Sequence, residues 1–476
     1  MKFLTRLIQL ILLLIPLGLF FWLVQREIVP SGVFVVRHAV GETSPYMDAL
    51  APKDRVKDEG TIIGDPVYFF LHPHRFFDRL EFEVWFQNLT VPIIEFGGLA
   101  KTNPEVYDLH PLQNRLIDEL TWDKISDGTF TLYQREPVWN SVADFLAQEV
   151  ADMATVAVYK ADYPVPFRLD QAGYQPTTDS KTLEVSLRGS HQLKTYIRDE
   201  TLRMEFEYID MNRDEGTDAV TATVFDEAGN PVADARSADD GNTKSDAISS
   251  SMKRLTLDVP NLPQGVYKIV LNTTRDVFVR KIHTPQQKLI FLNSIFIGDE
   301  IGYRESPSSI QFNTTSLRLR MQTRHAEGVQ EVAIGGVTHS ITEPYKMYAF
   351  ETTADLKTVE IPQGDLEIFF DGPVAFTPEQ LFYPDPQVIR PYTNLQDSEI
   401  QYVLTTYIPP RREGEWLVQT VKFNTAALWF DKKTWKFAFS APEIESLHAE
   451  FTVKAINTRF IREPFQWRDL LDLIRS

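Results

Sequence analysis

Cysteine is absent from the 476 residues of this chain. The absence excludes disulfide bridges, thiolate metal ligands and cysteine nucleophiles. Basic residues are in the minority, because 48 Lys and Arg face 66 Asp and Glu and leave a formal net charge of −18. An acidic chain lacks the electrostatic footprint of a nucleic-acid-binding protein, so we expect no nucleic-acid partner.

Several catalytic signatures are missing as well. The sequence has no Gly-x-Ser-x-Gly elbow, no His-Glu-x-x-His motif and no Gly-x-x-x-x-Gly-Lys-Ser/Thr phosphate loop. His72-Pro73-His74 is typical of a loop, and Ser190-His191 of a turn in which the two side chains do not face each other. We therefore expect a binding or structural protein rather than an enzyme. A glycan- or peptide-cleaving hydrolase on a β scaffold is the alternative, which a carboxylate–His–hydroxyl cluster in a pocket would favour.

Long apolar runs are also lacking, with one exception at residues 7–24. At about 1.5 Å per residue this run spans roughly 27 Å as a helix, close to the thickness of a hydrocarbon core. Lys2 and Arg6 precede the run and Trp22 lies near its end, a pattern that favours a cytoplasmic start. The sequence thus predicts a cytoplasmic stub at residues 1–6, a transmembrane signal-anchor, and an extracytoplasmic body at the cell envelope. A cleaved signal peptide is the alternative.

The body is rich in short stretches that alternate apolar and polar residues. Three of them lie at residues 80–86, 202–208 and 317–321. A period of two with one wet face is what an antiparallel sandwich strand requires. Each stretch is followed by a glycine turn that opens another strand, at Asp127-Gly128, Pro263-Gln264-Gly265 and Pro362-Gln363-Gly364.

The spacing of these strands and turns predicts a mostly β fold with about three tandem antiparallel β-sandwich domains. We place the domains at residues 32–168, 169–298 and 299–476, and keep one irregular β protein as the alternative. A short helix is expected at residues 141–150 with Ser141 as its cap. A stiff linker is expected at residues 163–167. A short amphipathic helix is expected near the C-terminus at residues 467–475, docked on a sheet or in contact with the membrane surface or a partner.

One acidic loop has the pattern of a calcium site. Oxygen-bearing side chains alternate at Asp210, Asn212 and Asp214, and Asp218 follows. Calcium takes about six to eight oxygen ligands, and a curved loop aims alternate side chains inward. The spacing departs from an EF-hand, so we expect a Ca²⁺ site on a β-sandwich loop, with Asp239, Asp240 and Asp246 as further candidates. A solvated acidic loop without metal is the alternative; no other cofactor is indicated.

Residues 183–283 carry a sequence of motifs with a family likeness. Leu202-Arg203-Met204-Glu205-Phe206-Glu207 is followed by the hairpin Val224-Phe225-Asp226-Glu227-Ala228-Gly229 and then by Leu262-Pro263-Gln264-Gly265-Val266-Tyr267. This layout resembles the pre-peptidase C-terminal type of β-sandwich and carbohydrate-binding sandwiches of similar plan. The resemblance implies an extracellular, non-catalytic accessory module.

Exposed tryptophans would suit the stacking of sugars. The candidates are Trp139, Trp416, Trp429 and Trp435. Taken together, the patterns predict a structural, adhesive or ligand-binding protein whose partners are the membrane and glycans or envelope proteins. An accessory subunit of an envelope complex is a further alternative.

Overall fold

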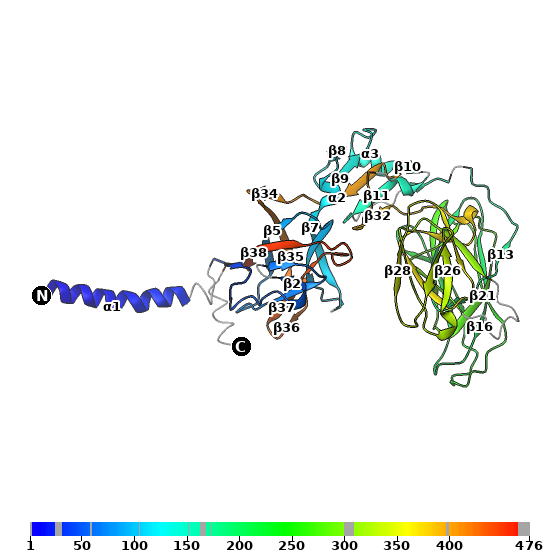
Figure 1. Ribbon diagram of the computed structural model, residues 1–476, viewed down its shortest axis with the longest axis horizontal. Coiled ribbons are helices and arrows are strands. Elements are labelled where there is room, and N and C mark those ends of the chain that lie inside the picture. Colours follow the sequence, from blue (N-terminus) through cyan, green and yellow to red (C-terminus); the bar gives the residue numbers. More distant parts are fainter. Residues whose placement is uncertain are drawn as a thin grey trace. The chain divides into compact units, whose positions relative to one another are not determined.

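The computed structural model describes residues 2–23, 31–57, 60–103, 105–150, 152–161, 168–171, 173–298, 309–396 and 399–464. Apart from three α-helices and five short 3-10 turns, the regular structure of these residues consists of β-strands (Figure 1). The mostly β fold predicted from the alternating stretches is therefore confirmed. The expected linker at residues 163–167 and the expected C-terminal helix at residues 467–475 lie outside the described residues. The 3-10 turns are η2 (Lys53–Arg55), η4 (Met153–Thr155), η5 (Ala326–Gly328), η6 (Pro378–Gln380) and η7 (Thr425–Ala427).

The first helix, α1 (Lys2–Leu23), covers most of the apolar run. Within the described residues no helix is long and apolar enough to cross a membrane. This finding corrects the predicted transmembrane anchor at residues 7–24 and the single-pass, extracytoplasmic localisation.

The chain divides into two compact units. Unit 1 comprises residues 1–121, 390–393 and 407–476, and unit 2 comprises residues 122–389 and 394–406. This division differs from the three tandem domains expected at residues 32–168, 169–298 and 299–476. The cause is the pairing of β5 (Arg79–Asn88), which lies between β35 (Trp416–Asn424) and β38 (Phe451–Ile461). Alternation tells which face of a strand is buried, but it does not name the neighbouring strand.

Unit 1 consists of two antiparallel sheets that share one core. The first sheet has the order β2-β3-β38-β5-β35-β34 with β1 on β38, and the second has the order β36-β37-β6-β7 with β4 on β37. Their remaining elements are β1 (Val33–Ala39), β2 (Val56–Lys57), β3 (Thr61–Ile62), β4 (Val67–Leu71), β6 (Ile93–Leu99), β7 (Tyr107–Asn114), α2 (Arg115–Asp118), β34 (Arg411–Glu413), β36 (Phe430–Asp431) and β37 (Thr434–Ser440).

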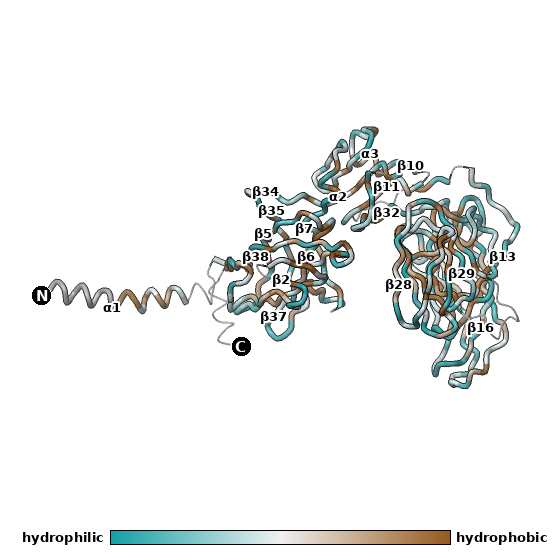
Figure 2. The backbone as a smooth tube through the Cα atoms, in the orientation of Figure 1, coloured by the Kyte–Doolittle hydropathy of each residue, from teal (hydrophilic) through white to brown (hydrophobic). Residues whose placement is uncertain are grey.

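Aromatic rings from both sheets fill the core of unit 1. Phe82 of β5 lies 4.6 Å from Phe437 of β37 and 5.0 Å from Phe96 of β6, measured between ring centroids. Along β5 the burial alternates through the whole strand, even where the sequence becomes apolar throughout. The predicted strand at residues 80–86 is therefore confirmed. In Figure 2 the apolar stretches follow the strands and many loops are polar.

Unit 2 is dominated by a sheet of nine strands and a sheet of ten. The first comprises β13 (Lys181–Leu183), β14 (Leu187–Arg188), β16 (Leu202–Asp210), β19 (Lys253–Val259), β21 (Val277–Thr284), β23 (Ser294–Ile297), β25 (Arg318–Gln322), β28 (Tyr348–Glu351) and β30 (Leu366–Phe370). The second comprises β15 (His191–Ile197), β17 (Val220–Phe225), β18 (Pro231–Ser237), β20 (Gly265–Asn272), β22 (Leu289–Phe291), β24 (Ile310–Thr314), β26 (Gln330–Ile334), β27 (Val337–Ile341), β29 (Lys357–Ile361) and β31 (Val374–Ala375).

These two sheets contain an internal duplication. Strands β14 to β22, the first repeat, recur in the same order as β23 to β31, the second repeat. Thus β16 pairs with β19 and β21 as β25 pairs with β28 and β30, and β17 pairs with β18 and β20 as β26 pairs with β27 and β29. The Pro-Gln-Gly turns precede β20 and β30, which are not equivalent strands. The shared topology, not that tripeptide, marks the duplication.

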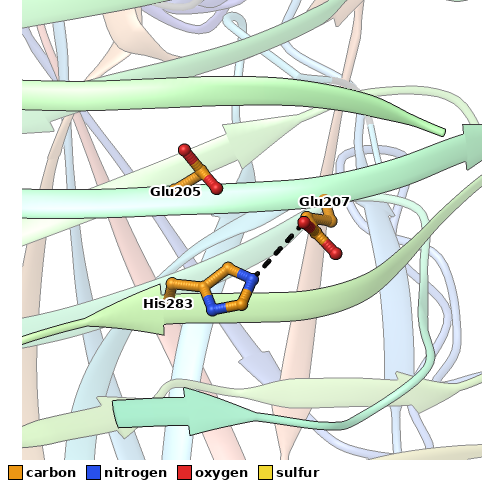
Figure 3. A group of neighbouring side chains, drawn as sticks. All are labelled: Glu205, Glu207 and His283. Carbon is orange, nitrogen blue, oxygen red and sulfur yellow. Dashed lines mark ion pairs between the residues drawn. The ribbon is translucent and has the colours of Figure 1, made fainter. Parts of the chain in front are cut away.

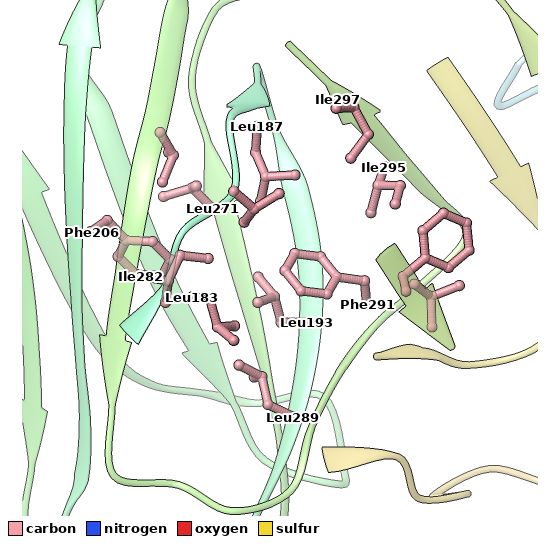
Figure 4. Close-up of a cluster of buried hydrophobic side chains, with 14 of the residues drawn as sticks. Leu183, Leu187, Leu193, Phe206, Leu271, Ile282, Leu289, Phe291, Ile295 and Ile297 are labelled. Carbon is pink, nitrogen blue, oxygen red and sulfur yellow. The ribbon is translucent and has the colours of Figure 1, made fainter. Parts of the chain in front are cut away.

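The two repeats join edge to edge through β14–β23 and β22–β31, so each sheet continues through both. One buried cluster runs across the joint, with Leu187 and Phe291 from the first repeat beside Ile295 and Ile297 from the second (Figure 4). Residues 183–283 form most of the first repeat, so the sandwich expected there is confirmed, but it is half of a continuous double sandwich.

A smaller mixed sheet completes unit 2, in the order β32-β11-β33-β9-β8, and a two-stranded pair β10–β12 accompanies it. Its elements are β8 (Asp123–Ser126), β9 (Thr131–Gln134), α3 (Val142–Ala147), β10 (Glu149–Val150), β11 (Val156–Tyr159), β12 (Arg168–Leu169), β32 (Gln387–Val388) and β33 (Tyr402–Thr405). Ser141 caps α3, since its side chain accepts a hydrogen bond from the Asp144 N–H. The helix is shorter than expected because Gln148 is extended and β10 begins at Glu149.

Candidate functional site

Three connections meet at one end of the first repeat. They are the loop between β16 and β17, the loop between β18 and β19, and the turn between β20 and β21. Alternate antiparallel connections lie at the same end of a sandwich, which brings residues 210–218, 239–240 and 276 together although they are distant in sequence. The acidic loop singled out by its sequence is the first of the three.

Three nearly fully buried side chains in this cluster carry an oxygen with no hydrogen-bond partner among the described residues. Asp210 is 2 % exposed, Asn212 is 1 % exposed and Asp276 is 0 % exposed. The oxygens without a partner are Asp210 Oδ2, Asn212 Oδ1 and Asp276 Oδ1. Buried polar atoms are almost always hydrogen-bonded, so three unmatched acceptors in one place call for a donor or a cation.

The other polar atoms of the same three side chains are used to hold them in place. Asp210 Oδ1 accepts from the Asn212 N–H at 3.1 Å, and Asn212 Nδ2 donates to Asp240 Oδ2 at 3.0 Å and to the Ile248 carbonyl at 2.8 Å. Asp276 Oδ2 accepts from the backbone N–H of Asp214 at 3.0 Å. One polar atom of each side chain is therefore held by hydrogen bonds, while the other, an oxygen, can accept a donor or bind a cation.

Asp218 and Asp239 complete the group, which we call the Asp210 cluster (Asp210, Asn212, Asp218, Asp239 and Asp276). Carboxylate oxygens of Asp210, Asp218 and Asp239 lie within 4.8 Å of one another. Asp218 accepts from the Thr274 hydroxyl, and Asp239 Oδ1 accepts from the Asp218 N–H at 2.7 Å. Three carboxylates from two connections thus lie together, and the buried Asn212 and Asp276 adjoin them, with Asp276 coming from the third connection.

The electrostatics of the Asp210 cluster are unfavourable without a counter-charge. Burial raises the pKa of Asp210 to about 6, and the neighbouring carboxylates of Asp218, Asp240 and Asp276 raise it further against one backbone hydrogen bond. Burial and the charges of Asp276, Asp239 and Asp214 also raise the pKa of Asp218. Like charges held together in a partly desolvated place favour the binding of a cation.

In the second repeat, protein side chains supply the hydrogen-bond donors of the equivalent buried aspartate. Asp276 directly precedes β21, and Asp365 directly precedes β30, the equivalent strand. Asp365 is also buried, but it accepts from the Thr323 hydroxyl at 2.9 Å and lies 3.0 Å from His325 Nδ1. A protein side chain supplies the hydrogen-bond donors there, whereas Asp276 Oδ1 has none among the described residues.

The sequence and the structure agree on part of the acidic set. Of the predicted ligands, Asp210, Asn212 and Asp218 lie in the cluster, while Asp214 is exposed and contributes its backbone N–H. Of the further candidates, Asp239 and Asp240 are close, and Asp246 is exposed and accepts from Asn242 Nδ2 at 3.0 Å. Asp276 was not predicted, because only the pairing of β21 with β16, which sets Asp210 opposite Val277, brings its turn to the loop. The aspartate that precedes both β21 and β30 is the signal that a search for duplication would have found.

A second group of ligand-type side chains lies on the outer face of the nine-stranded sheet (Figure 3). Glu205 and Glu207 project from β16, and His283 of β21 is opposite Glu205. His283 Nε2 is 3.6 Å from Glu207 Oε1. Arg254 of β19 already pairs with Glu207 at 2.7 Å and with Glu205 at 3.6 Å. Because a guanidinium supplies the counter-charge, we interpret this group as a cross-strand ion-pair network.

The Ser190-His191 pair makes no catalytic relay. Ser190 Oγ donates to the Thr273 carbonyl at 2.8 Å. His191 is buried, its Nδ1 donates to the Gly189 carbonyl at 2.9 Å, and its Nε2 accepts from the Phe296 N–H at 3.1 Å. Both ring nitrogens are therefore used by the backbone, as the turn interpretation predicts.

Burial gives this histidine a pH effect that can be measured. Desolvation lowers the pKa of His191 from 6.5 to about 4. As the pH falls from 6.5 to about 4, the unfolded chain binds this proton and the folded chain does not, so the free energy of unfolding is expected to decrease by about 3 kcal/mol. Urea unfolding of wild type and His191→Phe at several pH values isolates the effect. The variant is expected to be less stable at pH 7 but to show a flatter pH dependence; an unchanged slope would refute the assignment.

His72 has a carboxylate partner. His72 Nε2 lies 2.8 Å from Asp48 Oδ1, and Thr434 Oγ1 lies 3.5 Å from His72 Nδ1. The hydroxyl–imidazole distance exceeds the range of about 2.6–3.2 Å for direct proton transfer. Thr434 Oγ1 is closer to the Lys432 carbonyl, at 3.3 Å. This contact favours a polar binding surface over the nucleophile of a hydrolase.

Comparisons with known proteins add no family. No protein-family model and no curated protein matches the chain. Among solved structures, the chain is similar to an archaeal virus protein with a triple jelly roll fold, at 6% identity over 68% of this chain and 84% of that chain, with a TM-score of 0.17. It is also similar to the VP2 subviral particle protein of infectious bursal disease virus, at 9% identity over 94% of this chain and 87% of that chain, with a TM-score of 0.17. Likenesses this low carry no argument about function.

Proposed function

We propose that this chain is a calcium-binding β-sandwich protein with a structural or ligand-binding role, in which the Asp210 cluster holds the ion. The observation that supports this proposal is the set of three buried oxygens without partners, on Asp210, Asn212 and Asp276. In each of these side chains the other polar atom makes a hydrogen bond that fixes the side chain in place. The site is therefore organised before an ion binds. Preorganised ligands lose little freedom on binding.

The chemistry of the donors favours Ca²⁺ over other ions. All donors of the cluster are carboxylate or amide oxygens, which suits a hard cation and not zinc or copper. Ca²⁺ accepts about six to eight oxygens at about 2.3–2.6 Å in flexible geometry, whereas Mg²⁺ demands a compact octahedron and keeps several waters. A site assembled from three separate connections meets the looser requirement more readily.

Binding of Ca²⁺ to the Asp210 cluster would hold in place the loops that carry the ligands. The loops at residues 211–219 and 238–252 contain few buried apolar side chains, so packing alone holds them weakly. An ion shared by both loops and the β20–β21 turn cross-links one end of the first repeat. A non-catalytic role of this kind agrees with the hydrogen bonds that occupy Ser190 and His191.

Calorimetric titration with CaCl₂ after removal of bound metal tests the proposal directly. We expect one Ca²⁺ per chain for the wild type and at least a tenfold weaker affinity for Asp276→Asn, which removes a charge and keeps the shape. Asp246→Asn is the matched control, since Asp246 is exposed on the β18–β19 loop and is expected to leave the affinity unchanged. No heat of binding for the wild type, or equal affinities for the two variants, would overturn the proposal.

A further inference from the structure

A cavity of about 340 Å³ lies in unit 1, on the face of the second sheet that points away from the core. Its lining residues are Asp48, Phe70, His72, Leu99, Trp429, Asp431, Lys432, Thr434 and Lys436. The volume falls at the lower end of small-molecule sites, which run from about 300 to about 1,000 Å³. This cavity is remote in sequence from the Asp210 cluster and belongs to the other unit.

Aromatic side chains occupy a face of the sheet that would ordinarily be polar. Tyr68 and Phe70 alternate on β4 with the buried Phe69 and Leu71, so they share the outer face, and His72, which directly follows β4, lines the cavity with Phe70. Trp429 is 41% exposed, and its backbone N–H donates to the Leu99 carbonyl at 2.8 Å, which holds the indole beside the cavity. Exposed flat rings next to a cavity mark a ligand site and not a core. Of the four tryptophans named from the sequence, Trp435 is fully buried and Trp429 lines the cavity.

The polar groups around the indole combine donors and acceptors in balanced charge. The lining includes two carboxylates, on Asp48 and Asp431, and two ammonium groups, on Lys432 and Lys436. His72 is fixed by Asp48 at 2.8 Å, and Lys436 Nζ lies 4.3 Å from the centre of the Tyr68 ring. A strongly charged ligand would meet a like charge in this cavity, whereas a neutral ligand with many hydroxyl groups would find partners for both its donors and its acceptors.

The turn that carries Lys432 adds to the polar rim. Lys432 and Lys433 connect β36 to β37 with φ values of 48° and 63°. Glycine or asparagine is the usual choice at such positions in a two-residue hairpin turn. Two lysines in the left-handed region are unusual, and side chains kept in unfavourable backbone conformations cluster at ligand sites.

We infer that this cavity binds one unit of a neutral saccharide, whose apolar ring face stacks on the Trp429 indole while its hydroxyl groups bond to Asp48, His72 and Lys432. A sugar ring has one flat apolar face and a polar edge, the combination that an exposed indole beside mixed donors and acceptors recognises. The inference does not depend on the calcium proposal, because no residue of the Asp210 cluster takes part.

Saturation-transfer NMR on the full chain tests the inference with cellotetraose, maltotetraose and xylotetraose as neutral probes and trigalacturonate as a charged one. We expect transfer to at least one neutral probe and weak or no transfer to trigalacturonate. Trp429→Ala should weaken the affinity about tenfold, since it removes the largest apolar surface of the cavity.

Trp416→Ala is the matched control. Trp416 belongs to the other sheet of unit 1, where Lys454 Nζ lies 4.8 Å from the centre of its ring. It does not line the cavity, so its removal should leave the affinity unchanged. Near-ultraviolet circular dichroism confirms that both variants fold. Absence of transfer to all neutral probes, preference for trigalacturonate, equal affinities for the two variants, or cleavage of a probe during the measurement would each overturn the inference.

Discussion

A chain truncated after residue 406 is expected to lose the folded state of unit 1 altogether. The truncation removes β35, β37 and β38, which lie in the centre of the two sheets. β5 loses both of its neighbours, and the core loses Phe437, Phe439 and Phe460 together. Removing one such buried phenylalanine costs about 3–5 kcal/mol, and the loss of several exceeds the whole stability of a typical domain, about 5–15 kcal/mol.

Amide hydrogen exchange read by mass spectrometry distinguishes the two units in that experiment. In the truncated chain, peptides from residues 67–114 should exchange as an unfolded chain does, while peptides from residues 187–298 stay protected. A fragment of residues 122–406 is the control, since it contains the whole of unit 2 and is expected to unfold in one cooperative transition. Protection of residues 67–114 after truncation would favour the tandem arrangement expected from the sequence.

The sequence predicted local structure well and long-range structure poorly, for a physical reason. Alternation along residues 80–86 and 202–208 identified β5 and β16 and their buried faces, because the period of a strand is a local property. The partner of β5 lies more than 300 residues away, and nothing in its alternation points to β35 rather than to any other strand. For the same reason the duplication could not be recognised from the sequence. Equivalent strands in the two repeats share their pairing and order, whereas the repeated Pro-Gln-Gly turns precede β20 and β30, which are not equivalent strands.

The sequence likewise predicted only part of the candidate cation site. Asp210, Asn212 and Asp218 were predicted because the oxygens of one loop alternate in sequence. Asp276 comes from another connection, so only the assembled sandwich brings it to the loop. The His72–Asp48 contact is a further case, because the histidine directly follows β4 and the aspartate lies 24 residues earlier, outside the named strands. Loop patterns therefore reveal the part of a site that lies on one loop.

Chelation of calcium is expected to lower the free energy of unfolding of unit 2 by about 4 kcal/mol, if the free ion stands at about a thousand times its dissociation constant beforehand. Urea unfolding in about 5 mM CaCl₂ or in about 5 mM EGTA measures the difference. The cause is mass action, because an ion bound by the Asp210 cluster has no equivalent site in the unfolded chain. Equal midpoints in calcium and in EGTA would contradict the expectation.

The substitution Asp210→Asn is expected to change the free energy of unfolding in opposite directions with and without calcium. Without calcium the variant should be more stable than wild type, by about 1 kcal/mol, because the substitution removes one of several like charges from a buried place. With calcium it should be less stable, because it removes a ligand. Asp365→Asn, at the equivalent end of the second repeat, should destabilise in both conditions, since it breaks the contacts with Thr323 and His325 and touches no cation ligand. A substitution that only weakens the packing would lower the free energy of unfolding both with and without calcium. A change of sign for Asp210→Asn, together with no change of sign for Asp365→Asn, would therefore distinguish ion binding from packing.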